Sequence, residues 1–157
     1  MNDPSGRKSE GAFTFVKLMA AIAIILLLAT MAGSFARVQI RRARESELRR
    51  DLRTMREAID SYKNSSDRGM IPVKADSFGY PPDLKALVEG ITVRGNASAK
   101  YRFLRRIPID PMTGKADWGT RSEQDDPDSR GGGGENVFDV FSKSQGTGLD
   151  GTLYAEW

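Results

Sequence analysis

The longest apolar stretch of the sequence runs from Phe13 to Ala36 and contains one charged residue, Lys17. No further charge occurs before Arg37, which leaves about 19 uncharged residues, close to the roughly 20 that a helix needs to cross a bilayer. A helix satisfies its own backbone hydrogen bonds, so it is the form in which a single segment crosses lipid. We therefore expect a membrane-spanning helix over residues 13–36, preceded by a polar segment over residues 1–12.

Two other interpretations of this stretch fit less well. A cleaved secretory signal has a shorter apolar core and a small-residue cleavage site, whereas here Ala32, Gly33 and Ser34 lead into a charged helical pattern. A helix buried on every side would need a larger domain than the remaining chain supplies. In the polar segment before the stretch, Pro4 and Gly6 disfavour a helix.

The helical pattern continues over residues 37–63, because no Pro and a single Gly occur between Thr14 and Lys63. In this second part, apolar side chains recur every three or four positions, which places them on one helix face. These residues are Leu48, Leu52, Met55, Ile59 and Tyr62. We expect this amphipathic face to pack against the chain's own domain, with packing on neighbouring copies as the alternative.

The other faces of residues 37–63 are charged. Opposite charges four residues apart favour a helix by about 0.2–0.5 kcal/mol per pair. Such pairs occur at Glu45/Arg49, Arg53/Glu57 and Arg56/Asp60. Arginines cluster between Arg37 and Arg44, where anionic lipid headgroups would attract them. Interleaved acidic residues cancel much of the positive field, which argues against nucleic acid as a partner.

Residues 64–157 are long enough for one small domain. Gly69 is expected to end the long helix. A short helix is predicted over residues 83–89, flanked by Pro and Gly and with its apolar side chains toward the core. The weakly patterned residues 91–99 are predicted to form a loop.

The later part of the domain predicts turns and strands. Pro108–Gly114 is a dense turn cluster, and Trp118 after it is a candidate core residue. Residues 121–135 are rich in Asp, Ser and Gly and are expected to form a mobile loop. Asn136–Phe141 alternates as a half-buried strand does, and Thr152–Trp157 is expected to close a hairpin. Antiparallel strands packed on the long helix would bury both apolar faces, so the expected class is α+β.

Composition excludes several kinds of chemistry. The 157 residues include no His and no Cys, and 24 basic against 21 acidic side chains give a net charge of +3. The chain therefore lacks the commonest general base, a thiolate nucleophile and the usual zinc ligands. No nucleophile–base spacing and no phosphate-binding Gly loop before a helix is recognisable. We do not expect an enzyme.

The two ends of the chain together resemble one protein family. Phe13-Thr-Phe-Val-Lys-Leu-Met19, after a short basic leader, is similar to the N-terminal signature of type IV pilins and pseudopilins. Farther on, the chain is similar to the major pseudopilin of type II secretion systems at Ile107–Gly114, Trp118, Phe138–Ser142 and Leu149–Trp157. The resemblance covers nearly the whole chain and implies a pilin-like fold, in which a long N-terminal helix carries a small antiparallel head.

The resemblance implies a structural subunit of a secretion pseudopilus. In that family a prepilin peptidase removes the leader and methylates the new N-terminus; here the processing residues would be Gly11, Ala12 and Phe13. The helices of many copies then bundle into a homo-oligomeric filament that drives protein export across the outer membrane. Minor pseudopilins and an inner-membrane assembly platform are the implied partners. The protein would cross the inner membrane once, with its leader in the cytoplasm and residues 64–157 in the periplasm, an orientation that the flanking charges alone leave open.

The sequence departs from the family pattern near the processing site. The residue before the expected cut is Ala12 instead of Gly, with Gly11 one step earlier, and the fifth mature residue is Lys17 instead of Glu. In the family that carboxylate pairs with the N-terminal amine of a neighbouring subunit. A lysine there places a cation beside a cation, which costs several kcal/mol when both are buried. We therefore expect that assembly of this chain is impaired by Lys17, that the lysine is an engineered or mutated residue, or that it pairs with another group. In a monomer the Lys17 side chain can extend to the headgroups without harm.

The resemblance also raises a calcium site in the C-terminal loop. The family binds the ion through Ser, Asp and backbone oxygens, and Ser142, Ser144 and Asp150 are the matching residues. Ca²⁺ takes six to eight oxygen ligands, normally with several carboxylates. Because Asp150 is the main charged candidate, calcium and an ordinary turn both stay open, and no other cofactor is expected.

Two other functions fit a single anchoring helix with a small head. A type IV pilin-like subunit would act in adhesion or DNA uptake, although the C-terminal disulfide usual in pilins is absent. A non-assembling, membrane-anchored periplasmic binding module would leave Lys17 without consequence.

Overall fold

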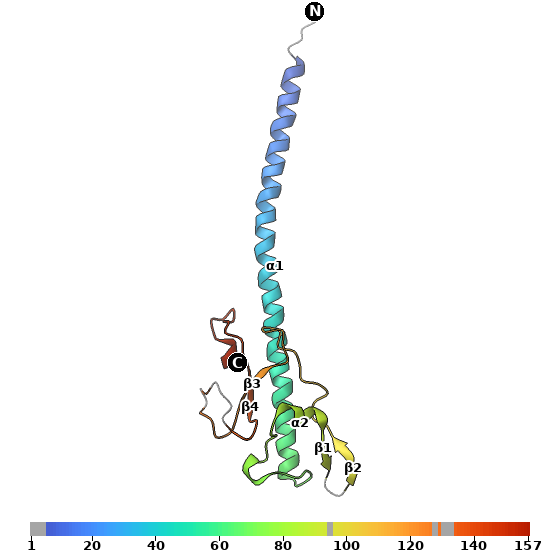
Figure 1. Cartoon of the computed structure of the whole chain (residues 1–157). Helices are drawn as coiled ribbons and strands as arrows, with labels where there is room; N and C mark the ends of the chain where they lie inside the picture. Colours follow the sequence, from blue (N-terminus) through green and yellow to red (C-terminus); the bar gives the residue numbers. More distant parts are fainter. Residues whose placement is uncertain (1–5, 94–95, 127–128, 130–133) are drawn as a thin grey trace, which may run out of the picture. The chain divides into compact units, whose positions relative to one another are not determined.

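The computed structural model describes residues 6–93, 96–126, 129 and 134–157; the side chains of residues 6–12, 30–35, 75 and 93–99 lie outside this description. Figure 1 shows the elements in chain order. They are α1 (Gly6–Asp67), the 3₁₀ turn η1 (Ala75–Ser77), α2 (Leu84–Glu89), β1 (Ile91–Val93), β2 (Asn96–Tyr101), β3 (Trp118–Arg121), β4 (Asp139–Ser142) and the 3₁₀ turn η2 (Tyr154–Glu156). The expected α+β class is confirmed.

The chain divides into two compact units, Met1–Arg41 and Arg42–Trp157. The first holds the N-terminal part of α1, and the second holds its later turns together with every other element. Because α1 begins at Gly6, the prediction of a non-helical polar segment is wrong for residues 6–12. Extending an existing helix is much easier than nucleating one, and these residues include Arg, Lys, Glu and Ala, which are good helix formers.

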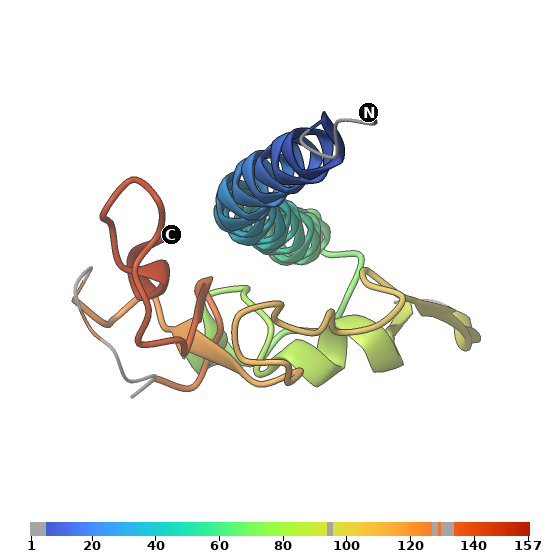
Figure 2. The same cartoon turned by 90° about the horizontal axis from the view of Figure 1, so that it is seen from above.

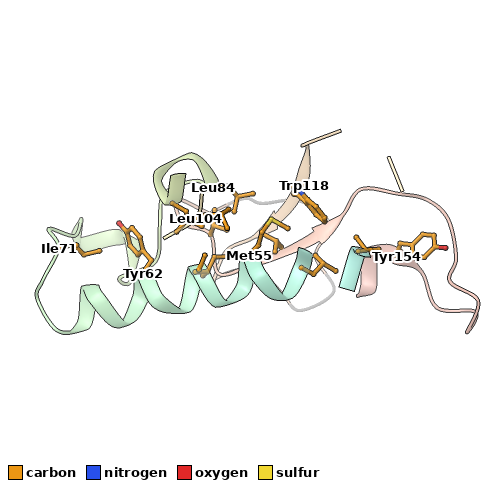
Figure 3. Packing of buried hydrophobic residues seen from close by; sticks show 14 residues of the cluster. Met55, Tyr62, Ile71, Leu84, Leu104, Trp118 and Tyr154 are labelled. Atoms are coloured by element: carbon orange, nitrogen blue, oxygen red, sulfur yellow. The ribbon is translucent and has the colours of Figure 1, made fainter. Parts of the chain in front are cut away.

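The amphipathic face of α1 forms the core of the second unit, as the sequence predicts. All of its side chains, from Leu48 to Tyr62, are at most 3% exposed. Figure 3 shows Met55 on the side of α1 that faces Leu104 and Trp118. Full burial of an apolar side chain stabilises a fold by about 1.5–3 kcal/mol. In Figure 2 the domain covers one side of this part of α1. Other α1 residues, such as Arg53, are exposed.

The short helix α2 forms where the sequence predicts it. The Asp83 carboxylate caps its N-terminus by accepting a 2.8 Å hydrogen bond from the Ala86 backbone N–H. Gly90 ends the helix with a φ of 80°, a conformation that favours glycine. Leu84 and Leu87 are buried against the α1 face. Local capping signals therefore placed this element correctly.

Residues 91–99, predicted to be a loop, lie mostly in strands. β1 and β2 pair antiparallel, with Ile91 opposite Tyr101 and Thr92 opposite Lys100. The next residues after β2 are fixed to α2, because the backbone N–H groups of Phe103 and Leu104 both donate to the Leu87 carbonyl at 3.0 Å. Cross-strand pairing and this anchor stabilise a segment whose own pattern is weak.

A second sheet joins β3 and β4 in antiparallel register, with Trp118 opposite Ser142. Trp118 is buried, as predicted. The predicted strand over residues 136–141 is shifted, since β4 spans Asp139–Ser142, and the half-buried alternation is wrong at its end because Val140 and Phe141 are both buried. Pairing with β3 sets the limits of β4, and a single-strand pattern does not contain that information.

The C-terminal segment was expected to close a hairpin as its second strand, and this prediction is wrong. A single bridge joins Thr147 to Leu153, and the chain then forms η2. Of the predicted mobile loop over residues 121–135, residues 127–128 and 130–133 lie outside the described residues. The loop's described beginning includes buried Ser122.

Candidate functional site

The N-terminal unit presents an apolar surface on every side of α1. Each described side chain from Phe13 to Ala29 is exposed, and the large apolar ones are 45–64% exposed. Contiguous apolar surface of this extent marks a site of contact with lipid or with another protein. Within the residues that the structure describes, no helix is both long and apolar enough to cross a bilayer. The expected span of 13–36 includes residues 30–35, whose side chains lie outside that description.

Phe13 and Lys17, two of the predicted site residues, lie together on this surface. The Lys17 ammonium lies 4.3 Å from the centroid of the Phe13 ring. Residues four apart share a helix face, and a cation over an aromatic ring is attracted by the negative face of the ring. Gly11 and Ala12, the other predicted processing residues, belong to α1, and their side chains are outside the described ones.

The predicted calcium residue Ser142 is occupied by a neighbouring carboxylate. Its hydroxyl donates a 2.7 Å hydrogen bond to Asp110 Oδ2, and both residues are fully buried. Asp110 Oδ1 accepts the Met112 backbone N–H at 2.7 Å, and the Gly114 N–H donates to the Asp110 carbonyl at 2.8 Å. This closes the turn that the sequence predicts before Gly114. Asp110 and Ser142 thus connect that turn to β4.

Asp150, the second predicted calcium residue, is held by different partners. Its Oδ1 accepts hydrogen bonds from the Thr152 backbone N–H at 3.0 Å and from the Thr152 hydroxyl at 2.6 Å. Its Oδ2 forms a 3.0 Å ion pair with Arg49, whose guanidinium also stacks 4.1 Å from the centroid of the Trp157 ring. The Thr152 hydrogen bonds, and secondarily Arg49, lower the pKa of Asp150.

These contacts do not fit the calcium site that the resemblance raises. Both oxygens of Asp150 are engaged, and a guanidinium already neutralises its charge. Ser142 and Asp150 share none of their hydrogen-bond partners. Among the residues that the structure describes, no group of three or more His, Cys, Asp or Glu side chains is arranged to hold a metal ion. The groups around Asp150 instead form a turn that is closed by an ion pair with Arg49.

Glu45 of α1 joins the C-terminal segment to this helix through hydrogen bonds. Glu45 is 8% exposed, and its carboxylate accepts hydrogen bonds from the Leu149 backbone N–H and the Tyr154 hydroxyl, both at 2.9 Å. Tyr154 in turn packs edge-on against Trp157, with ring centroids 5.0 Å apart. A buried carboxylate of this kind depends on its donors, because it has lost most of its water.

A second ionic cluster centres on Asp139 in β4. Arg56 of α1 donates to Asp139 Oδ1 at 2.7 Å and to the Trp157 backbone oxygen at 2.6 Å. Arg121 of β3 donates to Asp139 Oδ2 at 3.1 Å and to the Ala155 carbonyl at 3.2 Å. One carboxylate between two guanidinium groups therefore fixes β4 and η2 against α1.

A groove of about 660 Å³ lies beside these clusters in the second unit. It is lined by Arg49, Leu52, Arg53, Arg56, Glu57, Asp60, Asp150, Thr152, Glu156 and Trp157. Both signs of charge and an indole ring border it, which suits a mixed polar and apolar contact. Elsewhere on α1, burial raises the pKa of Asp51, while Arg50 partly opposes the shift.

Sequence spacing misassigned the partners of the arginines on α1. Arg49 and Arg56 were predicted to pair along the helix, but they reach across to Asp150 and Asp139. Arg53 forms no ion pair with another described residue. Contacts with residues about 100 positions away carry no signal in a local pattern. By contrast, the Phe13–Lys17 contact has the i,i+4 spacing that could have revealed it.

Comparison of the chain with protein families, with curated proteins and with solved structures finds no match.

Proposed function

We propose that this chain is a structural subunit of a type II secretion pseudopilus, which assembles through the N-terminal part of α1. The observation that carries the proposal is the apolar surface from Phe13 to Ala29, exposed on all sides of the helix. Such a surface needs lipid before assembly and other helices afterwards. The second unit supports this division of roles, because it has a packed core of its own.

In this proposal the chain is an inner-membrane protein whose residues 1–12 are a cytoplasmic leader. A prepilin peptidase removes the leader before Phe13, and residues 64–157 lie in the periplasm. Copies of the chain then bundle with minor pseudopilins above an inner-membrane platform. The chain contributes no catalytic step; it converts assembly into displacement of exported proteins through the outer membrane.

Disulfide crosslinking in cells tests the proposal, because the chain has no natural Cys. Ile24→Cys, on the exposed surface, is expected to give a ladder of crosslinked multimers when the peptidase and the secretion apparatus are present. Leu48→Cys, buried in the second unit, is the matched control and should stay monomeric. A strictly monomeric Ile24→Cys protein beside a working apparatus would overturn the proposal.

The groove beside Trp157 favours a second candidate, a membrane-anchored periplasmic binding module. That protein would not assemble, so its Ile24→Cys variant would yield monomers whatever the apparatus. A pilin-like subunit of another filament system would give multimers without the secretion apparatus. The same crosslinking experiment, run with and without the apparatus, therefore separates the three functions.

A further inference from the structure

The second unit contains another pocket, of about 400 Å³, which shares no lining residue with the groove beside Trp157. Ligand pockets in proteins commonly have volumes of about 300–1,000 Å³. The walls of this pocket come mainly from α1, from the chain between α1 and α2, and from β1. They consist of two tyrosines, two prolines and an isoleucine, with a serine, a lysine and a glutamate as the other lining residues.

Tyr62 places an unpaired hydroxyl in this pocket. The residue is 3% exposed, and its ring centroid lies 5.2 Å from that of Phe103 in the core. Figure 3 shows the Tyr62 hydroxyl on the side of the ring away from Met55. Among the residues that the structure describes, this hydroxyl has no hydrogen-bond partner, whereas every fully enclosed side-chain oxygen or nitrogen has one. The hydroxyl therefore reaches the open space of the pocket, where it can donate to a ligand.

Tyr80 forms another wall of the pocket and is held by its neighbours. Its backbone N–H donates to the Ser77 carbonyl at 2.9 Å. Its ring packs edge-on against Phe138, with centroids 5.3 Å apart, and the Lys63 ammonium lies 5.5 Å from its centroid. Burial raises the pKa of both Tyr62 and Tyr80, so both hydroxyls keep the proton that a donor needs. A ring that is already fixed loses little freedom when a ligand binds.

The polar groups of the pocket are mainly hydrogen-bond donors. The hydroxyls of Tyr62 and Tyr80 and the ammonium of Lys74 can all donate. The Ser77 hydroxyl already donates to the Lys74 carbonyl at 2.9 Å, and Glu135 is the one carboxylate among the described lining residues. One cation and one anion leave the lining without net charge. The complementary ligand is therefore uncharged, largely apolar and rich in acceptors.

A proline-rich peptide has this character. Each proline has a carbonyl oxygen but no backbone N–H, so such a peptide offers acceptors and hardly any donors. Its polyproline II conformation exists before binding, and grooves lined by aromatic side chains recognise it. A sugar fits less well, because its hydroxyl groups are donors too and the lining has few acceptors for them.

We propose that this pocket binds a proline-rich segment of another protein, with proline rings against Tyr80 and a peptide carbonyl accepting from the Tyr62 hydroxyl. The chain beside the pocket exposes further apolar surface for such a partner. Phe78, between two lining residues, has a φ of 52°, which is rare for a bulky residue, and is 55% exposed. Val73, also between two lining residues, is 43% exposed. The site goes beyond the proposed function and does not depend on how α1 helices pack.

Fluorescence anisotropy of a labelled proline decamer, titrated with the full chain in detergent, tests the proposal. We expect saturable binding that unlabelled proline decamer reverses and a glycine–serine decamer does not. Tyr62→Phe should weaken binding by about fivefold, since one net hydrogen bond is lost. Tyr80→Ala, which removes a wall, should weaken it by about tenfold or more. Tyr101→Phe removes the hydroxyl of a half-exposed tyrosine outside the lining, so this matched control should bind as wild type does.

Tyr62→Phe also separates binding from folding. The hydroxyl has no partner in the free chain, so its removal should leave the free energy of unfolding unchanged or higher while binding weakens. Absence of saturable binding to the proline decamer would overturn the inference, and so would a Tyr62→Phe variant that binds it as tightly as wild type. Displacement of the labelled peptide by maltohexaose but not by unlabelled proline decamer would also overturn it, because the pocket would then be a sugar site. None of these results alters the crosslinking of Ile24→Cys, so the proposed function is tested separately.

Discussion

Glu45 and Tyr154 lie 109 residues apart in the sequence, yet the Tyr154 hydroxyl donates a 2.9 Å hydrogen bond to the Glu45 carboxylate. The same carboxylate oxygen accepts the Leu149 backbone N–H. Both contacts join the C-terminal segment to α1. Because hydrogen bonds to a charged group are stronger than neutral ones, this pair contributes strongly to holding that segment on α1.

Removing the Tyr154 hydroxyl tests this contribution. Tyr154→Phe keeps the packed ring but removes a donor from a buried carboxylate, so we expect the free energy of unfolding to fall by about 1.5–3 kcal/mol. Urea denaturation of the full chain in detergent measures the change. Tyr101→Phe, which removes the hydroxyl of a half-exposed ring in β2, is the control and should change little. Equal losses in the two variants would contradict the role given to Glu45.

The Asp150 turn predicts a dependence on pH. Because hydrogen bonds from Thr152 and the charge of Arg49 lower the pKa of Asp150, the folded state favours the ionised carboxylate. Its contribution is therefore present above the ordinary pKa of 3.8 and is lost as pH falls through the lowered value. We expect Asp150→Asn to be less stable than wild type at about pH 6, and we expect this difference to shrink as pH falls below 3.8. A stability difference that does not change with pH would show that the charge is unimportant.

The contacts of the same turn predict that calcium does not change the stability of the protein. Arg49 already neutralises Asp150, and Thr152 occupies its other oxygen. Since a ligand stabilises only the state that binds it, the midpoint of thermal unfolding should be the same in millimolar Ca²⁺ and in EDTA. Mg²⁺ at the same ionic strength is the control for salt effects. A midpoint raised by Ca²⁺ and not by Mg²⁺ would restore the family's metal site.

Buried Asp110 and Ser142 should be energetically coupled. Removing either side chain leaves the other without its partner in a fully buried place, which typically costs about 1–3 kcal/mol. In a double-mutant cycle, Asp110→Ala and Ser142→Ala together should therefore cost clearly less than the sum of the single changes. Asp117 and Lys143, an exposed ion pair on the neighbouring surface, provide the matched cycle. Their coupling should stay below about 1 kcal/mol; comparable coupling in both cycles would contradict the prediction.

Much of the helical structure follows from local pattern. The buried face from Leu48 to Tyr62 has the spacing of one helix side, and α2 has both its cap residues in sequence, Asp83 and Gly90. Trp118 could be predicted as a core residue because tryptophan side chains are highly buried on average. In each case a few neighbouring residues determine the outcome.

Apart from the helical start of α1, the errors arise from contacts that the pattern of a single segment does not contain. β1 and β2 form because Ile91 pairs with Tyr101 and because the two residues 103 and 104 after β2 are hydrogen-bonded to the Leu87 carbonyl. The arginines of α1 leave their helical neighbours because Asp139 and Asp150 offer better geometry from the other end of the chain. Within the candidate site, the Phe13–Lys17 contact and the turn before Gly114 have signals in the local sequence.

Gly119 should be intolerant of even one added methyl group. It lies in β3 directly opposite Phe141 of β4, and a Cβ at this position would overlap the buried Phe141 ring. That ring cannot move freely, because the Arg121 guanidinium lies 4.5 Å from its centroid. Gly119→Ala should therefore destabilise the second unit by about 1–3 kcal/mol, as overpacking does, measured by urea denaturation of the full chain. Phe141→Leu makes room for the methyl group, so the double variant should lose less stability than the two single changes added together. A strictly additive double variant would mean that the cost of Gly119→Ala arises elsewhere than at the Phe141 ring.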